Sequence, residues 1–143
     1  MTEELKQQDE IEPVKKDYVV IDLSVWANQG LFVGSTISVK GIMYSGTVIS
    51  GREWCKRHID LYENAEIGEH EKAGMKSYFE QLIKEVYNDE NVKSQIDKNH
   101  DPDYIHMSVT SISGQKHIGD KETLWRFRIS EIDGIFLGSL QLI

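Results

Sequence analysis

The chain has 143 residues, enough for one domain, and 39% of them are hydrophobic, enough to bury a core. Its 24 acidic and 16 basic residues give a formal net charge of -8, which repels nucleic acid and anionic membrane surfaces. The single cysteine, Cys55, excludes an internal disulfide, and no apolar run approaches the roughly 20 residues that cross a bilayer. We therefore expect a cytoplasmic protein without a membrane segment.

Charge divides the chain into segments. Residues 1–17 hold six acidic and three basic residues, a net charge of -3, and no aromatic residue, which predicts a disordered acidic tail. Residues 60–103 hold twelve acidic and five basic residues, a net charge of -7. We expect residues 18–143 to form a single domain, with most of this acidic stretch inside a helical insertion at about residues 52–100.

The first predicted elements follow the tail. YVVIDLSVWANQG, residues 18–30, has the β-branched content of a strand, but Asn28 and Gly30 are typical of a helix that ends at a glycine, and we interpret the segment as a short helix. STISVK and GIMYSGTVIS, residues 35–50, alternate as two strands do. Gly46 inside the second strand predicts a bulge or a sharp bend.

Helices are predicted next. REWCKRHIDLY begins a helix at Arg52, and AGMKSYFEQLIKEVY, residues 73–87, has apolar residues at three- and four-residue spacings with acidic residues on the other face. These apolar residues are Met75, Phe79, Leu82, Ile83 and Val86. The pattern is that of an amphipathic helix.

Three strands are predicted after the insertion. YIHMSVTSIS, residues 104–113, places Ile105 and Met107 on one side, and LWRFRISEIDGIFLGSLQLI, residues 124–143, supplies two short strands broken near Gly134. The elements together predict the α+β class. We expect a small antiparallel barrel or a strongly bent antiparallel sheet, with an N-terminal helix and an inserted helical segment.

GTVISGREW, residues 46–54, has the outline of a phosphate-binding loop, with two glycines five positions apart and then a basic residue. Such a loop requires a lysine followed by Ser or Thr, whereas Arg52 and Glu53 occupy these positions. Because the carboxylate of Glu53 would repel phosphate, we interpret Gly51 as the junction between a strand and a helix.

Two further groups combine residue types that bind metals or catalyse reactions. Imidazole and carboxylate groups are close in sequence at His100, Asp101, Asp103 and His106. Pro102 breaks their spacing, and a solvated turn that leads into a strand is the simpler interpretation. Cys55 and His58 lie three residues apart on a predicted helix, with no oxyanion hole nearby. We therefore expect no enzyme, metal or other cofactor.

A basic and aromatic cluster lies near the C-terminus, at Trp125, Arg126, Phe127 and Arg128. If Arg126 and Arg128 share one strand face, they can grip an anion or stack on a base. We favour instead ion pairs between these arginines and the acidic insertion, because positive charge is too sparse for a nucleic-acid footprint. The candidate interaction residues are Arg52, Trp54, Trp125, Arg126 and Arg128.

Three strings, in this order, resemble the gas vesicle accessory protein U (GvpU) family: SVKGIMYSGTVISGREW, DYIHMSVTSISG and LWRFRISEIDGIFLG. With the preceding LSVWANQG, the resemblance covers about residues 23–138, loosely within the insertion. Phe127, where the family pattern has a small residue, and the acidic tail depart from it. The resemblance implies a non-catalytic accessory protein that clusters or assembles gas vesicles through contacts with shell or other accessory proteins and with itself.

The chain is also distantly similar to an Sm-like barrel interrupted by a helical insertion. Sm-like proteins bind RNA through an Asp and an Asn in one loop and an Arg-Gly in another, but here no glycine follows Arg126 and the insertion replaces the first loop. An Sm-like RNA-binding module is the alternative function, and a metal-assisted hydrolase is a third. Self-association would use free strand edges near residues 42–49 or 135–142.

Overall fold

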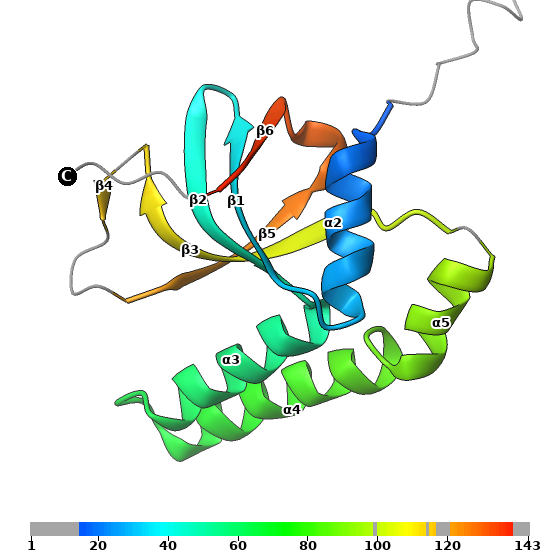
Figure 1. Ribbon diagram of the computed structural model, residues 1–143. Helices are drawn as coiled ribbons and strands as arrows, with labels where there is room; N and C mark the ends of the chain where they lie inside the picture. The colour runs from blue at the N-terminus through cyan, green and yellow to red at the C-terminus, as the bar shows by residue number, and fades with distance from the viewer. Residues whose placement is uncertain (1–14, 99, 114, 117–120, 139–143) are drawn as a thin grey trace, which may run out of the picture.

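A computed structural model describes residues 15–98, 100–113, 115–116 and 121–138 (Figure 1). In chain order the elements are α2 (Tyr18–Asn28), β1 (Val33–Val39), β2 (Ile42–Ile49), α3 (Gly51–Glu63), α4 (Glu69–Glu85), α5 (Asp89–Asp97), β3 (Tyr104–Ile112), β4 (Gln115–Lys116), β5 (Thr123–Arg128), the 3-10 helix η1 (Ile129–Glu131) and β6 (Gly134–Leu137). Of the tail predicted over residues 1–17, residues 1–14 lie outside the described part of the chain.

The N-terminal helix α2 is confirmed. It begins after Asp17, whose side chain accepts hydrogen bonds from the backbone N–H groups of Val19 and Val20, an N-cap that satisfies two otherwise free donors. It ends before Gly30, which has a positive φ of 100° that a residue with a side chain adopts with strain. The residues at the two ends of the segment thus stabilise a helix, although its β-branched residues favour a strand.

The strands form one antiparallel sheet in the order β5-β3-β2-β1-β6, and the two-residue β4 also pairs with β3. The described residues leave the sheet open, so the bent sheet is observed and not the closed barrel. The free edge expected near residues 42–49 is wrong, because β2 lies between β1 and β3 and its backbone is paired on both sides. At the other end of the order, β6 pairs with β1.

The bend predicted at Gly46 is confirmed as an irregularity between β2 and β3. Ser45 lies opposite Ser111, whereas Gly46 lies opposite Val109, so the register shifts by one residue between them. A Cβ atom on Gly46 would overlap the backbone carbonyl oxygen of Ser108. The strand therefore bends where the two backbones are too close for any side chain.

One face of the sheet holds the core and is covered by α2 (Figure 1). The buried residues of this core are Val20, Leu23, Ala27, Ile37, Val48, Ile105, Met107, Val109, Phe127 and Ile129. Since successive side chains of a strand point to opposite faces, His106 and Ser108 point away from the core and toward α3.

The helical insertion is confirmed as α3, α4 and α5, with α3 and α4 lying side by side (Figure 1). The segment at residues 46–54 is the strand-to-helix junction expected. Ser50 caps α3 by accepting a hydrogen bond from the Glu53 N–H at 2.9 Å, and the Gly51 N–H donates to the side chain of Asn28 at 3.2 Å. Two of the first backbone donors of α3, those of Gly51 and Glu53, are therefore satisfied within the chain.

Candidate functional site

The five candidate interaction residues lie in three places. Arg52 and Trp54 are on α3, at the start of the insertion, and Arg126 and Arg128 are on the face of β5 that lies opposite the core. Trp125 is on the other face of β5, beside the core. Alternation along β5 thus separates the tryptophan from the two arginines that surround it in the sequence.

Trp125 belongs to an aromatic group with Tyr44 and Phe127. The rings of Trp125 and Phe127 stack with their centres 5.7 Å apart. The centre of the Tyr44 ring lies 5.0 Å from that of Trp125 and 4.9 Å from that of Phe127. The indole N–H of Trp125 donates to the Thr123 hydroxyl at 2.8 Å. These contacts explain the phenylalanine at position 127, because its ring is buried and completes the group.

Arg52 and Trp54 have different surroundings. Arg52 pairs with Asp89 at 3.3 Å on the surface. The ring of Trp54 packs against His58 at 4.3 Å and against His106 at 5.1 Å. Trp54 therefore fills the space between the insertion and the sheet, whereas Arg52 is accessible.

His106 lies between the sheet and the insertion. Its side chain points away from the core as expected, but it is 4% exposed because α3 and the residues after α4 cover it. Its Nε2 lies 3.0 Å from the Tyr87 hydroxyl. Burial, together with the smaller effect of the positive charge of Arg126, lowers the pKa of His106 to about 3. The expected solvated position of His106 is therefore wrong, and the ring is neutral at pH 7.

Three of the groups considered for metal binding and nucleophilic catalysis, Asp103, Cys55 and His58, have surroundings typical of structural residues. Asp103 pairs with Lys16 at 2.7 Å, and within the described residues no three metal-binding side chains come together. Burial raises the pKa of the Cys55 thiol to about 11, so it is not a thiolate at neutral pH. His58 stacks on Phe79 at 4.6 Å, and burial lowers its pKa.

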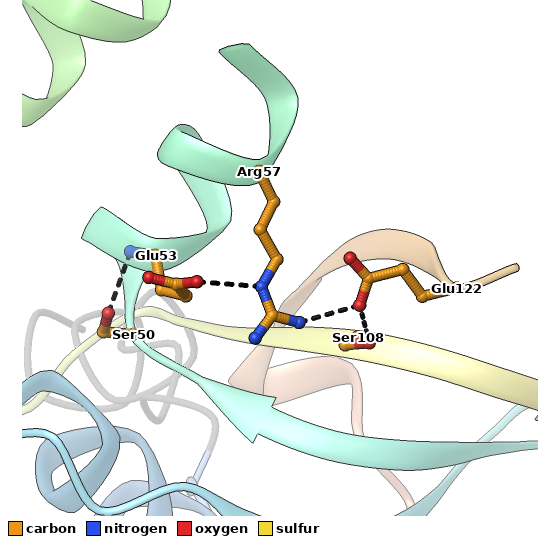
Figure 2. A network of polar contacts seen from close by, with 5 residues as sticks. All are labelled: Ser50, Glu53, Arg57, Ser108 and Glu122. Atoms are coloured by element: carbon orange, nitrogen blue, oxygen red, sulfur yellow. Dashed lines mark hydrogen bonds and ion pairs between the residues drawn. The ribbon is translucent and has the colours of Figure 1, made fainter. Parts of the chain in front are cut away.

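A polar network, absent from the sequence-based expectations, joins the insertion to the sheet (Figure 2). Arg57 on α3 donates to Glu53 at 3.0 Å and to Glu122 at 2.7 Å, and Glu122 accepts a hydrogen bond from Ser108 on β3. The spacing of Glu53 and Arg57 is a helical signal that the sequence carries. Nothing local links Arg57 to Glu122, which is 65 residues away.

We expect a double-mutant cycle with Arg57→Ala and Glu122→Ala to give a coupling free energy on the order of 1 kcal/mol, because the pair is partly exposed and hydrogen-bonded. The measurement is urea unfolding of the four proteins. The same cycle on Arg52 and Asp89 is the control and should give a coupling near zero, since Asp89 is 94% exposed. Equal coupling in the two cycles would contradict the structural role of the network.

Arg126 and Arg128 share one face of β5, where Arg126 lies opposite His106 and Arg128 opposite Tyr104. The guanidinium of Arg126 lies 3.7 Å from the centre of the Tyr104 ring, a cation–π contact. The ion pairs expected between these arginines and the acidic insertion are not formed by the described residues.

The edge strand β6 is a second candidate surface. Its residues pair with β1 from Ser38 opposite Gly134 to Ser35 opposite Leu137. In the described part of the chain, no strand pairs with its other side. Phe136 and Leu137 are 55% and 60% exposed there. No helix among the described residues is long and apolar enough to span a membrane.

These features define a class of protein: a small α+β domain in which a bent, open antiparallel sheet carries a helical insertion and leaves an apolar strand at its edge. A protein-family model described as "Gas vesicle protein GvpU-like" matches residues 17–140. The chain therefore belongs to the GvpU-like family and is a gas vesicle-related protein, as the three sequence strings indicate. Searches of curated proteins and of solved structures found no match.

Proposed function

We propose that this protein is a non-catalytic, cytoplasmic accessory protein that clusters or assembles gas vesicles by binding their shell or other accessory proteins and by self-association. The observation that carries the proposal is the family match over residues 17–140. The positions of Cys55, His58 and His106 support it, because their contacts are those of packed structural groups.

The edge strand β6 supports the self-association part of the proposal. Unpaired backbone groups at a sheet edge accept a further strand, and apolar side chains such as Phe136 and Leu137 add buried area to that contact. This edge is at the start of the region, residues 135–142, where the sequence predicts one. We propose that β6 carries contacts between copies of the chain.

Flotation tests the vesicle contact directly, since intact gas vesicles are buoyant. We expect the purified protein to rise with intact vesicles during centrifugation, and to leave the floating layer after the vesicles are collapsed by pressure. Sedimentation of the protein alone, at low and high salt, should show species larger than a monomer. A strict monomer that stays below the floating layer would overturn the proposal.

A pair of variants tests whether the contact between copies lies on β6. Phe136→Lys with Leu137→Lys adds charge to the edge, and we expect about tenfold weaker self-association, equivalent to about 1.4 kcal/mol. Tyr78→Lys is the control, because Tyr78 is 56% exposed on α4, away from the sheet. Equal loss in both variants would argue against β6 as the contact.

The RNA-binding alternative has one observation in its favour, the shared face of Arg126 and Arg128. Against it, the formal net charge is -8, and the insertion with twelve acidic residues between positions 60 and 103 stands on the same side of the sheet. We therefore retain protein partners as the proposal and treat nucleic acid as an outcome of the experiment below.

A further inference from the structure

A polar cleft of about 470 Å³ opens between α5 and the adjoining ends of α2, β3 and β5. Its lining includes Tyr87, Asn91, Gln95, Tyr104, His106 and Arg126. The volume falls in the range of clefts that bind small ligands, roughly 300–1,000 Å³. Neither the family description nor the polar network of Arg57 accounts for this cleft.

Arg126 and Lys98 are the two basic side chains that line the cleft, and Arg126 is the one that packs on an aromatic ring. Tyr104 holds the guanidinium plane at 3.7 Å, and none of the carboxylates in the described residues forms an ion pair with it. An arginine always carries its charge and offers five N–H donors, and the Tyr87 hydroxyl interacts with this guanidinium. A guanidinium that lines a cleft and has no ion-pair partner among the described residues is suited to an anion.

The neighbouring groups favour one kind of anion. Gln95 accepts from Asn28 through Oε1 at 3.3 Å, and its amide nitrogen donates to none of the described residues, so a donor is left in the cleft that Arg126 also lines. Asp101 and Asp103 also line the cleft, and they would repel a doubly charged phosphate more strongly than a carboxylate. The planar fork of a guanidinium matches a carboxylate through two parallel hydrogen bonds.

We propose that this cleft binds a carboxylate of a peptide segment from a protein partner, with Arg126 as the anchor and Gln95 as a second donor. The carboxylate can belong to an acidic side chain or to the C-terminus of the partner. The proposal extends beyond vesicle binding and does not depend on it, because the cleft lies away from β6.

Three small blocked peptides test the ligand chemistry by NMR with the ¹⁵N-labelled full chain. N-acetyl-glycyl-leucine has a terminal carboxylate, N-acetyl-aspartyl-leucine amide has a side-chain carboxylate, and N-acetyl-glycyl-leucine amide has none. We expect the side-chain signals of Arg126 and Gln95 to shift with one or both carboxylate peptides, which identifies the source, and to stay in place with the amide. Equal shifts with all three would overturn the proposal.

Two substitutions on the same strand face test the anchor. Arg126→Gln should weaken carboxylate binding at least tenfold, and Arg126→Lys should restore only part of it, because the planar fork is lost. Arg128→Gln is the matched control, since Arg128 is exposed on the same face but does not line the cleft, and it should bind as the unmodified chain does. Equal binding by Arg126→Gln and Arg128→Gln would overturn the assignment.

Inorganic phosphate and a short single-stranded oligonucleotide are the competing probes. We expect both to bind more weakly than the carboxylate peptides at low salt, where phosphate contacts are strongest. Tighter binding of either probe at Arg126 would overturn the peptide proposal in favour of a phosphate ligand. Thermal unfolding of each variant separates loss of binding from loss of folding, and flotation with vesicles tests the proposed function separately.

Discussion

Gly46→Ala is expected to lower the free energy of unfolding by about 3 kcal/mol, the largest loss we expect from adding one methyl group. The new Cβ would overlap the backbone carbonyl oxygen of Ser108 on the neighbouring strand. A Cβ has no rotamer through which to avoid a clash, and the carbonyl belongs to a paired strand. The two central strands would have to separate or shift where their register changes.

Urea unfolding followed by tryptophan fluorescence measures this effect. Gly74→Ala is the matched control, because Gly74 is inside α4 and a Cβ there meets no atom within 4 Å. Since alanine favours a helix over glycine, this variant should gain roughly 0.5–1 kcal/mol. A Gly46→Ala protein within about 0.5 kcal/mol of the unmodified chain would show that the close approach of the strands is not rigid.

The signals that predict the fold from the sequence are local. Asn28 and Gly30 end α2, and Gly46 marks the irregularity in β2, because these positions restrict the backbone through their own chemistry. The order of strands is not a local property. From the sequence we expect a free strand edge near residues 42–49. In the structure, β3, which follows the insertion, pairs with these residues.

The contacts of the site follow the same division. That Trp125 and Arg126 lie on opposite faces of β5 can be predicted from the sequence, because side chains alternate with a period of two residues along a strand. The burial of His106 could not be predicted, since α3 must fold back over the sheet for Trp54 to pack against the imidazole. The three sequence strings that resemble the GvpU family indicate the family of the protein, but they do not predict the contacts of Trp125 or His106.

Acidification is expected to destabilise the protein through His106. Its pKa is about 3 in the folded chain, because of burial and the charge of Arg126, against an ordinary value of 6.5 in the unfolded chain. Between these values the unfolded chain binds more protons, so stability falls as the pH drops below about 6.5. At pH 5 this group alone should cost about 2 kcal/mol, and below pH 3 its contribution stops changing.

The groups packed around His106 determine how specific this effect is. His58 on α3 also has a pKa lowered by burial, so it adds to the loss in the same direction. Burial raises the pKa of Tyr87, so its hydroxyl stays neutral across this range and continues to face His106. Arg126 stays charged and opposes protonation of the imidazole throughout.

Urea unfolding at pH 7 and pH 5 measures the effect, and His106→Gln isolates it. The amide of the new side chain does not titrate, so the loss of stability between the two pH values should be about 2 kcal/mol smaller than in the unmodified chain. His70→Gln, at an exposed position on α4, is the control for replacing a histidine. If His106→Gln keeps the full pH dependence, protonation of His106 is not what destabilises the protein in acid, and His58 becomes the group to replace next.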